Sequence, residues 1–123
     1  MEKHSYNKRQ VGTEKETLAA EYLRGKGYFI IEKNYRVRQG EIDLVAKDRD
    51  TLVFVEVKYR KNPASGFAAE AVGMAKQRKI SRVSLSYLSE HGISPDTAIR
   101  YDVIAIDQDV ITHYENAFLY CYL

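Results

Sequence analysis

The stretch GEIDLVAKDRDTLVFVEVKYRK, from Gly40 to Lys61, decides the fold of this chain. Two largely apolar runs flank the polar segment DRDT, which is the pattern of two antiparallel strands joined by a short turn. Three charged residues, Asp43, Glu56 and Lys58, interrupt the apolar runs. Charged side chains are rarely buried without a partner, so their placement in the hairpin bears directly on function.

The register of this hairpin determines which charged side chains meet. If DRDT is a four-residue loop that pairs Lys47 with Leu52, counting back along both strands places Asp43 directly opposite Glu56. Side chains alternate between the two faces of a strand, so we expect both carboxylates on one face. Directly paired residues have Cβ atoms about 4.5–5.5 Å apart.

Strict alternation also sorts the other residues of the second strand. We expect one face to hold Glu41, Asp43 and Val45, and the other to hold Ile42, Leu44 and Ala46. The same register places Glu41 opposite Lys58.

Two facing carboxylates repel each other and destabilise a sheet unless a cation binds between them. Their oxygens suit a hard divalent ion such as Mg²⁺, with Mn²⁺ as a substitute. Lys58 lies one pleat further along the same face, where its ammonium would position an attacking water or neutralise charge that develops on a phosphate. The alternative is a cross-strand salt-bridge cluster at the surface, and from the residues alone both interpretations stay open.

Outside the hairpin, the hydrophobic periodicity predicts two helices and three further strands. The expected elements are a helix over 11–25, strands over 28–37, 41–47 and 52–60, a long helix over 67–90, and strands over 99–107 and 110–114. This order, αβββαβ and then β, predicts an α/β fold with a mixed central sheet flanked by helices. We expect a flexible polar tail over residues 1–10 and a single domain over 11–123.

The composition narrows the class of protein. A chain of 123 residues with 45% hydrophobic residues is long enough to bury a core without disulfides. Cys121 is the only cysteine, which favours the reducing cytoplasm. The sequence has neither a signal peptide nor an apolar run of transmembrane length, so no membrane partner is expected. The net charge of +2 is too small to indicate a polyanionic partner by itself.

The hairpin residues carry a resemblance to a known family. Asp43, followed by Glu56-Val57-Lys58 on the next strand, resembles the core signature of PD-(D/E)XK nucleases. The fuller pattern resembles the YraN-like family of predicted endonucleases, which is similar in fold to archaeal Holliday-junction resolvases, over most of residues 12–106. It consists of Gly12, Glu16 and Ala19, then GYFIIEKNYR, GEIDLV, VFVEVKYR, EAV and RYDVIAI.

The resemblance implies a restriction-endonuclease-like core and specific roles for its residues. Asp43 and Glu56 would bind Mg²⁺, with the backbone carbonyl of Val57 as a further ligand. Lys58 would be the catalytic lysine, and Glu16 the carboxylate contributed by the first helix. On a helical wheel, Glu16 borders the apolar stripe and would reach the sheet.

Basic residues elsewhere are candidates for contacts to nucleic-acid phosphates. Lys76 and Lys79 fall within the apolar stripe of the long helix, where they either extend along apolar surface to reach water or point past the sheet edge towards substrate. The remaining candidates are Arg36, Arg38, Arg60 and Lys61.

Two functions compete on these observations. The leading hypothesis is a metal-dependent endonuclease that recognises phosphate geometry or branched DNA rather than base sequence, with a homodimer as one possible assembly. The alternative is a nuclease-like fold that binds nucleic acid or a protein with little or no catalysis. The Asp43, Glu56 and Lys58 set favours the enzyme, and the modest net charge favours the binding module slightly.

Overall fold

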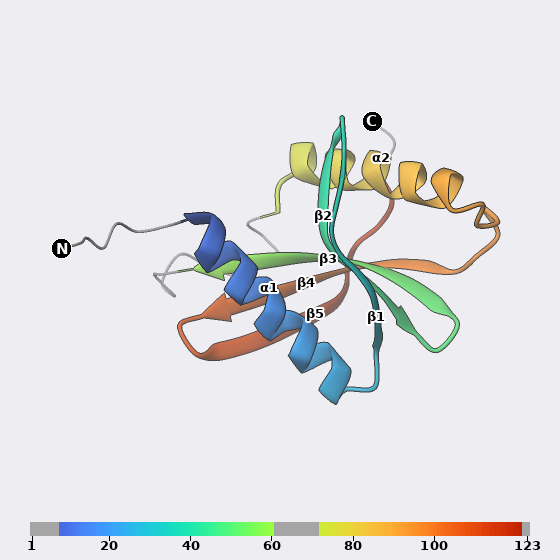
Figure 1. Cartoon of the computed structure of the whole chain (residues 1–123). Coiled ribbons are helices and arrows are strands. Elements are labelled where there is room, and N and C mark those ends of the chain that lie inside the picture. Colours follow the sequence, from blue (N-terminus) through green and yellow to red (C-terminus); the bar gives the residue numbers. More distant parts are fainter. Residues whose placement is uncertain (1–7, 61–71, 122–123) are drawn as a thin grey trace.

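The computed structural model describes residues 8–60 and 72–121 of the chain. The elements in these ranges are α1 (Lys8–Gly25), β1 (Phe29–Val37), β2 (Gly40–Asp48), β3 (Thr51–Arg60), α2 (Met74–Glu90), β4 (Ile99–Asp107) and β5 (Val110–Phe118) (Figure 1). Their order is the predicted αβββαβ followed by β, so the α/β class is confirmed.

The strands form one mixed sheet with the order β1-β2-β3-β4-β5. All neighbouring strands are antiparallel except β3 and β4, which are parallel and are connected through α2. A parallel pair needs such a crossover because its second strand must start at the same end of the sheet as the first. Helix α1 covers one face of the sheet and α2 the other (Figure 1).

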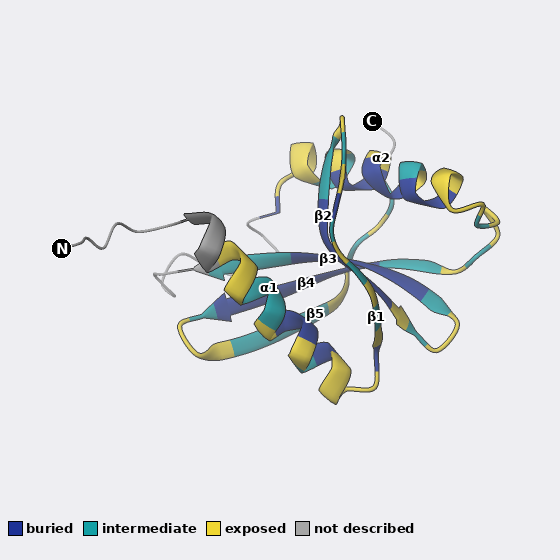
Figure 2. Ribbon diagram, viewed as in Figure 1, coloured by how far each residue is buried: buried dark blue, intermediate teal, exposed yellow. Residues whose placement is uncertain are grey.

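The hydrophobic core has two halves, one on each face of the sheet. Ala19, Ala20 and Leu23 of α1 are fully buried on one face. On the other face, α2 contributes Ile80 and Val83, among others, at helical spacing. Figure 2 shows the buried residues concentrated in the central strands and on the inner sides of both helices.

Several element boundaries differ from the prediction. Helix α1 begins at Lys8, within the stretch expected to be a flexible tail. Helix α2 begins at Met74 rather than at residue 67, because Gly73 adopts an extended conformation (φ −70°, ψ 172°). Residues 67–71 of the predicted helix lie outside the described residues. Val72 precedes the helix, yet it is still buried in the core on the α2 face.

Each helix has one apolar residue that does not face the core. Leu18 of α1 is 45% exposed, since Ala19, Ala20 and Leu23 form the buried side. Ala75 of α2 is likewise exposed, because it lies in the first turn, before the helix reaches the core.

The turn between β2 and β3 is tighter than expected, but the register is the predicted one. The strands continue through Asp48 and Thr51, which leaves a two-residue turn in which Arg49 has a positive φ of 58°. Residues with a left-handed backbone conformation suit tight hairpin turns, because the twist of such turns matches the twist of the flanking strands. Lys47 pairs with Leu52, as predicted.

Regular alternation breaks down in β2 at Asp43. Leu44 belongs to the core on the α1 face and Val45 to the core on the α2 face, as alternation requires. Ile42, however, also packs on the α2 face, so the prediction that it shares a face with Leu44 is wrong. The pairing of β2 with β3 runs only as far as the Leu44–Val55 pair.

Beyond that pair, the β1–β2 tip rises beside α2 while β3 continues in another direction (Figure 1). We call this point of separation, between the Leu44–Val55 pair and Asp43, the fork. The predicted ladder pairs of Asp43 with Glu56 and of Glu41 with Lys58 are therefore wrong, because β2 has already left β3. Glu41 instead pairs with Arg36 of β1.

Candidate functional site

Asp43 occupies the fork and is the centre of a cluster of acidic side chains. Its side chain is largely buried, with the residue 9% exposed, and its Oδ2 accepts a hydrogen bond of 2.8 Å from the backbone N–H of Val57. The carboxyl groups of Glu16 and Glu56 are both close enough to Asp43 for its charge to raise their pKa values. The structure thus brings together three of the four residues that the sequence identified as catalytic candidates.

These carboxyl groups arrive from opposite faces of the sheet. Glu16 projects from α1, whereas Glu56 lies on the α2 face, where its Oε2 is 3.4 Å from Nζ of Lys76. Asp43 can contact both because the separation of β2 from β3 opens the sheet at the fork. A regular hairpin would have confined Asp43 to a single face.

Glu41 is a member of the cluster that sequence reasoning did not select. Carboxylate oxygens of Glu16, Glu41 and Asp43 all lie within 4.8 Å of one another. The side chain of Glu41 also accepts a hydrogen bond of 3.1 Å from Nε of Arg36. The sequence signal for Glu41 is its place two residues before Asp43 in GEID, on the same expected face of the strand, although the expected register paired it with Lys58.

Burial and mutual repulsion raise the pKa values of this cluster. Burial, followed by the charge of Asp43, raises the pKa of Glu16 to about 7. The same two causes, in the same order, raise the pKa of Glu56 to about 8, although the charge of Lys76 opposes them. Burial also raises the pKa of Asp43, against the hydrogen bond from Val57. The cluster therefore holds protons near neutral pH unless another cation neutralises it.

These pKa values predict how the stability of the metal-free protein depends on pH. Glu16 and Glu56 bind protons in the folded state up to about pH 7 and 8, whereas their ordinary pKa is 4.5. Because the folded state binds more protons in this window, stability must fall as the pH rises. We expect the melting temperature to decrease by several degrees between pH 6 and pH 9, and Glu56→Gln to flatten the decrease.

Thermal melts in a chelating buffer would measure this effect. Glu21→Gln is a suitable control, since Glu21 lies on the exposed side of α1. A melting temperature that rises between pH 6 and pH 9 would show that the cluster does not destabilise the folded state.

Basic side chains gather on the α2 side of the fork. A cavity of about 360 Å³ is lined by Arg36, Lys76 and Lys79 together with Val37, Gly40 and Glu41. The aliphatic stem of Lys79 crosses Gly40 so closely that a Cβ there would lie 3.0 Å from its Cγ and Cδ. Lys79 thus extends along apolar surface and also faces a cavity at the sheet edge, which combines the two alternatives drawn from sequence.

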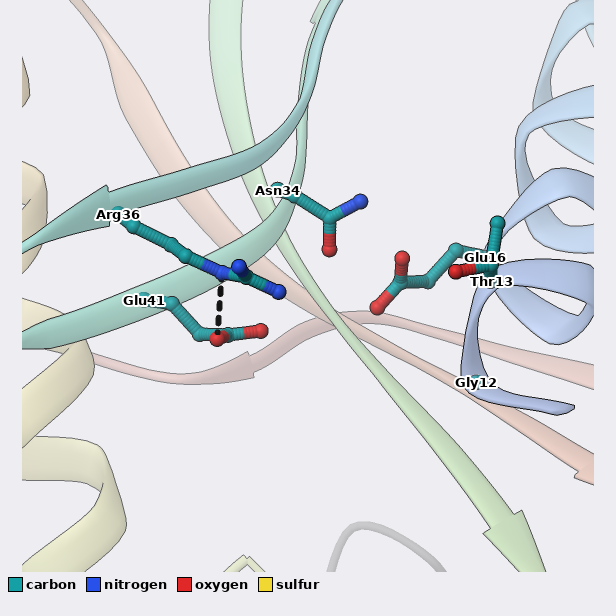
Figure 3. Close-up of a pocket in the computed structure, with 6 residues that line it drawn as sticks. All are labelled: Gly12, Thr13, Glu16, Asn34, Arg36 and Glu41. Carbon is teal, nitrogen blue, oxygen red and sulfur yellow. Dashed lines mark hydrogen bonds and ion pairs between the residues drawn. The ribbon is translucent and has the colours of Figure 1, made fainter. Parts of the chain in front are cut away.

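A second cavity, of about 210 Å³, lies on the α1 side and shares Arg36 and Glu41 with the first. Figure 3 shows the side chains of Glu16, Asn34 and Arg36 converging on it from α1 and β1. Glu41 lines both cavities and Glu16 lines only this one, so the cluster borders a more acidic and a more basic opening of the surface.

Lys58 lies on the same side of β3 as Glu56. Its neighbours Val57 and Tyr59 pack against the core on the α1 face, so alternation directs Lys58 to the α2 face. Its side chain is half-buried. The structure is consistent with the expected placement of this lysine one pleat beyond Glu56.

The structure describes the side chain of one further basic candidate, Arg38. Arg38 is exposed in the turn between β1 and β2. Arg60 ends β3, but its side chain lies outside the described residues, as does the whole of Lys61.

The donor atoms of the cluster suit a hard divalent cation. Carboxylate oxygens from Asp43, Glu16 and Glu41 lie within 4.8 Å of one another, and oxygen is the ligand that Mg²⁺ and Mn²⁺ prefer. Glu56 adds a fourth carboxylate through its contact with Asp43. The N–H of Val57 orients Asp43, which is a contribution of this residue that the sequence did not suggest.

Comparisons with known proteins support the resemblance found in the sequence. The sequence model of the "Uncharacterised protein family UPF0102" matches residues 15–106, which confirms the YraN-like resemblance. A UPF0102 protein from Lachnoclostridium phytofermentans is 46% identical over 112 residues, which cover 91% of this chain and 95% of the relative. A UPF0102 protein from Geobacter sulfurreducens is 44% identical over 123 residues, which cover 96% of this chain and 95% of the relative. Neither helix in the described ranges is long and apolar enough to cross a membrane.

Proposed function

We propose that this chain, which belongs to the uncharacterised protein family UPF0102, is a metal-dependent endonuclease that hydrolyses phosphodiester bonds in DNA. The observation that supports the proposal is the fork. There, the buried carboxylates of Asp43 and Glu56 meet Glu16 from the helix, with Lys58 on the same side of β3 as Glu56. Three acidic groups brought together at such a cost in repulsion are expected to hold a cation.

The carboxylates would hold Mg²⁺ or Mn²⁺ through Asp43 and Glu56, with Glu16 and Glu41 as further ligands. When bound, such a metal polarises a phosphate and lowers the pKa of a coordinated water. Val57 keeps Asp43 in place through its N–H. Lys76 neutralises part of the charge on Glu56, since its Nζ lies 3.4 Å from Oε2.

Lys58 would act on the reacting phosphate. Its position beyond Glu56 on the α2 face directs its ammonium to the side that also carries Lys76 and Lys79. There it would orient the attacking water or stabilise negative charge that develops on the phosphate oxygens. A lysine suits this role because its ammonium is a compact charge that carries three donors.

The substrate follows from the distribution of charge around the fork. Arg36, Lys76 and Lys79 line one cavity at the edge of the carboxylate cluster, so they would bind backbone phosphates next to the bond that is cut. Such contacts recognise the shape and charge of the nucleic acid rather than its bases, which favours a structure-selective enzyme.

A cleavage assay tests the proposal. Purified protein is incubated with linear, flapped and four-way DNAs in Mg²⁺ or Mn²⁺, with Glu56→Gln as the matched inactive variant. We expect the wild-type protein to cut at least one branched substrate, and the variant to cut none. If the wild-type protein binds these DNAs but cuts none with either metal, the endonuclease is refuted.

A binding module without catalysis is the second candidate, and two observations favour it. Lys76 already lies beside Glu56, and the raised pKa values let protons neutralise the cluster, so the fork is tolerated without a metal. The same surface would then bind DNA through its basic cavity alone. This candidate predicts that divalent ions do not strengthen DNA binding, because they only compete for the phosphates.

Lys79→Gln tests the basic cavity under either candidate. Lys79 contacts no carboxylate of the cluster in the described part of the chain, so its loss removes one phosphate contact and leaves the acidic residues intact. We expect affinity for DNA to fall severalfold, and the slope of log K against log salt to decrease by about one unit. Lys47→Gln, at the far end of the hairpin, is the control and should change neither quantity. An unchanged salt slope for Lys79→Gln would show that Lys79 does not contact DNA phosphates.

A further inference from the structure

Asn34, in the middle of β1, has a backbone conformation that strands normally exclude. Its φ is 58°, in the left-handed region that non-glycine residues enter rarely, although asparagine tolerates it better than most. Arg49 and Gln108 share this conformation in hairpin turns, where it is expected, and Asn116 (φ 54°) has it within β5, where the register with β4 shifts. No turn accounts for Asn34. Strain of this kind persists when the surrounding structure enforces it, and it is concentrated at functional sites.

The strained residue stands level with the fork. The pairs Lys33–Leu44 and Tyr35–Ile42 flank it, so Asn34 lies across from Asp43 without forming a ladder pair. Asp43 is also the residue at which the alternation of β2 breaks down. The irregular backbone of Asn34 and the departure of Asp43 from the strand pattern therefore occur at the same level of the β1–β2 hairpin.

The side chain of Asn34 faces the acidic cluster. Figure 3 shows its amide pointing into the cavity of about 210 Å³, towards the carboxylate of Glu16. The amide favours the ionised form of Glu16, in opposition to the charge of Asp43. An amide can therefore orient this carboxylate without introducing a cation that would compete with a metal.

We infer that Asn34 is a positioning residue for the metal site of the proposed function, on which this inference rests. Its left-handed backbone interrupts the β1–β2 ladder, which frees Asp43 to turn towards the N–H of Val57. Its amide orients Glu16 towards the same site. The two parts of the inference act on different carboxylates, so they can be tested separately.

The backbone part is tested in the metal-free protein by comparing Asn34→Gly with Asn34→Ala. Glycine adopts positive φ freely, whereas alanine in this conformation costs about 1–2 kcal/mol. Neither variant has the amide. We expect hydrogen exchange of the Val57 amide to be about tenfold faster in the alanine variant than in the glycine variant, because its bond to Asp43 is lost.

Gln108→Gly and Gln108→Ala are the matched controls, since Gln108 has the same conformation (φ 56°) in the turn after β4. This pair should leave exchange at Val57 unchanged. Equal exchange in the two Asn34 variants would overturn the backbone part of the inference.

The amide part is tested by calorimetric titration with Mn²⁺. Asn34→Gly keeps the backbone and removes the amide, so we expect Mn²⁺ binding to weaken about fivefold. In a Glu16→Gln background, the same substitution should have no further effect, because the amide would act through Glu16. Equal weakening in both backgrounds, or none in either, would overturn this part. A wild-type protein that binds no Mn²⁺ would refute the proposed metal site, while the exchange experiment would still decide the role of the backbone.

Discussion

Lys58→Ala should lower the single-turnover rate of DNA cleavage by about 10²-fold or more, with little loss of DNA affinity. The substitution removes a cation from the α2 face of β3 and leaves Asp43, Glu56 and Glu16 in place. If the ammonium acts on the attacking water or on charge that develops in the transition state, its loss slows chemistry far more than binding. A single phosphate contact would change the salt slope by only about one unit.

The measurement compares single-turnover cleavage and salt-dependent binding on the same substrate. Lys47→Ala is the control, because Lys47 is an exposed lysine at the other end of the same hairpin. Binding of Mn²⁺ should survive in both variants, which separates loss of chemistry from loss of the metal. If Lys58→Ala changes affinity and leaves the rate at saturating substrate intact, Lys58 is a binding residue and the catalytic role fails.

Asp102→Ala should destabilise the protein by about 3–5 kcal/mol, since it breaks a buried network of charges. Asp102 is fully buried in β4 and accepts hydrogen bonds from Nε of Arg100 (2.9 Å), Nε2 of His113 (2.7 Å) and the backbone N–H of Asn116 (3.0 Å). Burial alone would raise the pKa of Asp102, but these bonds hold it below the ordinary value. Its removal leaves the largely buried Arg100 and His113 side chains without their shared partner.

Urea unfolding at pH 7 would measure this loss, which corresponds to a decrease in melting temperature of about 10 °C or more. Glu21→Ala is the control, because Glu21 forms only an exposed ion pair with Arg24, and such pairs contribute little. A loss below about 1 kcal/mol for Asp102→Ala would mean that the network does not stabilise the fold.

The sequence was sufficient for the order of the elements and for the register of the β2–β3 hairpin. Period-two and helical patterns are local, so they identify strands and helices without knowledge of the partners. The pairing of Lys47 with Leu52 followed from the short DRDT segment alone. The same register predicted that Asp43 and Glu56 lie close together, because register propagates along a regular ladder. The buried network around Asp102 was not predicted, since its members are scattered over β4 and β5 and His113 has no characteristic spacing.

Only the tertiary structure decided how the carboxylates meet. Alternation predicted a flat hairpin with Glu41 opposite Lys58, but β2 leaves β3 at the fork and carries Glu41 towards Arg36. The positive φ of Asn34 lies level with the fork, and no pattern of residue types in the sequence predicts it. Whether Glu16 reaches Asp43 depends on how α1 packs across the sheet, which is set by many contacts at once. Local sequence therefore determined which residues bear charge, whereas the bend of one strand and the docking of one helix determined which charges share a site.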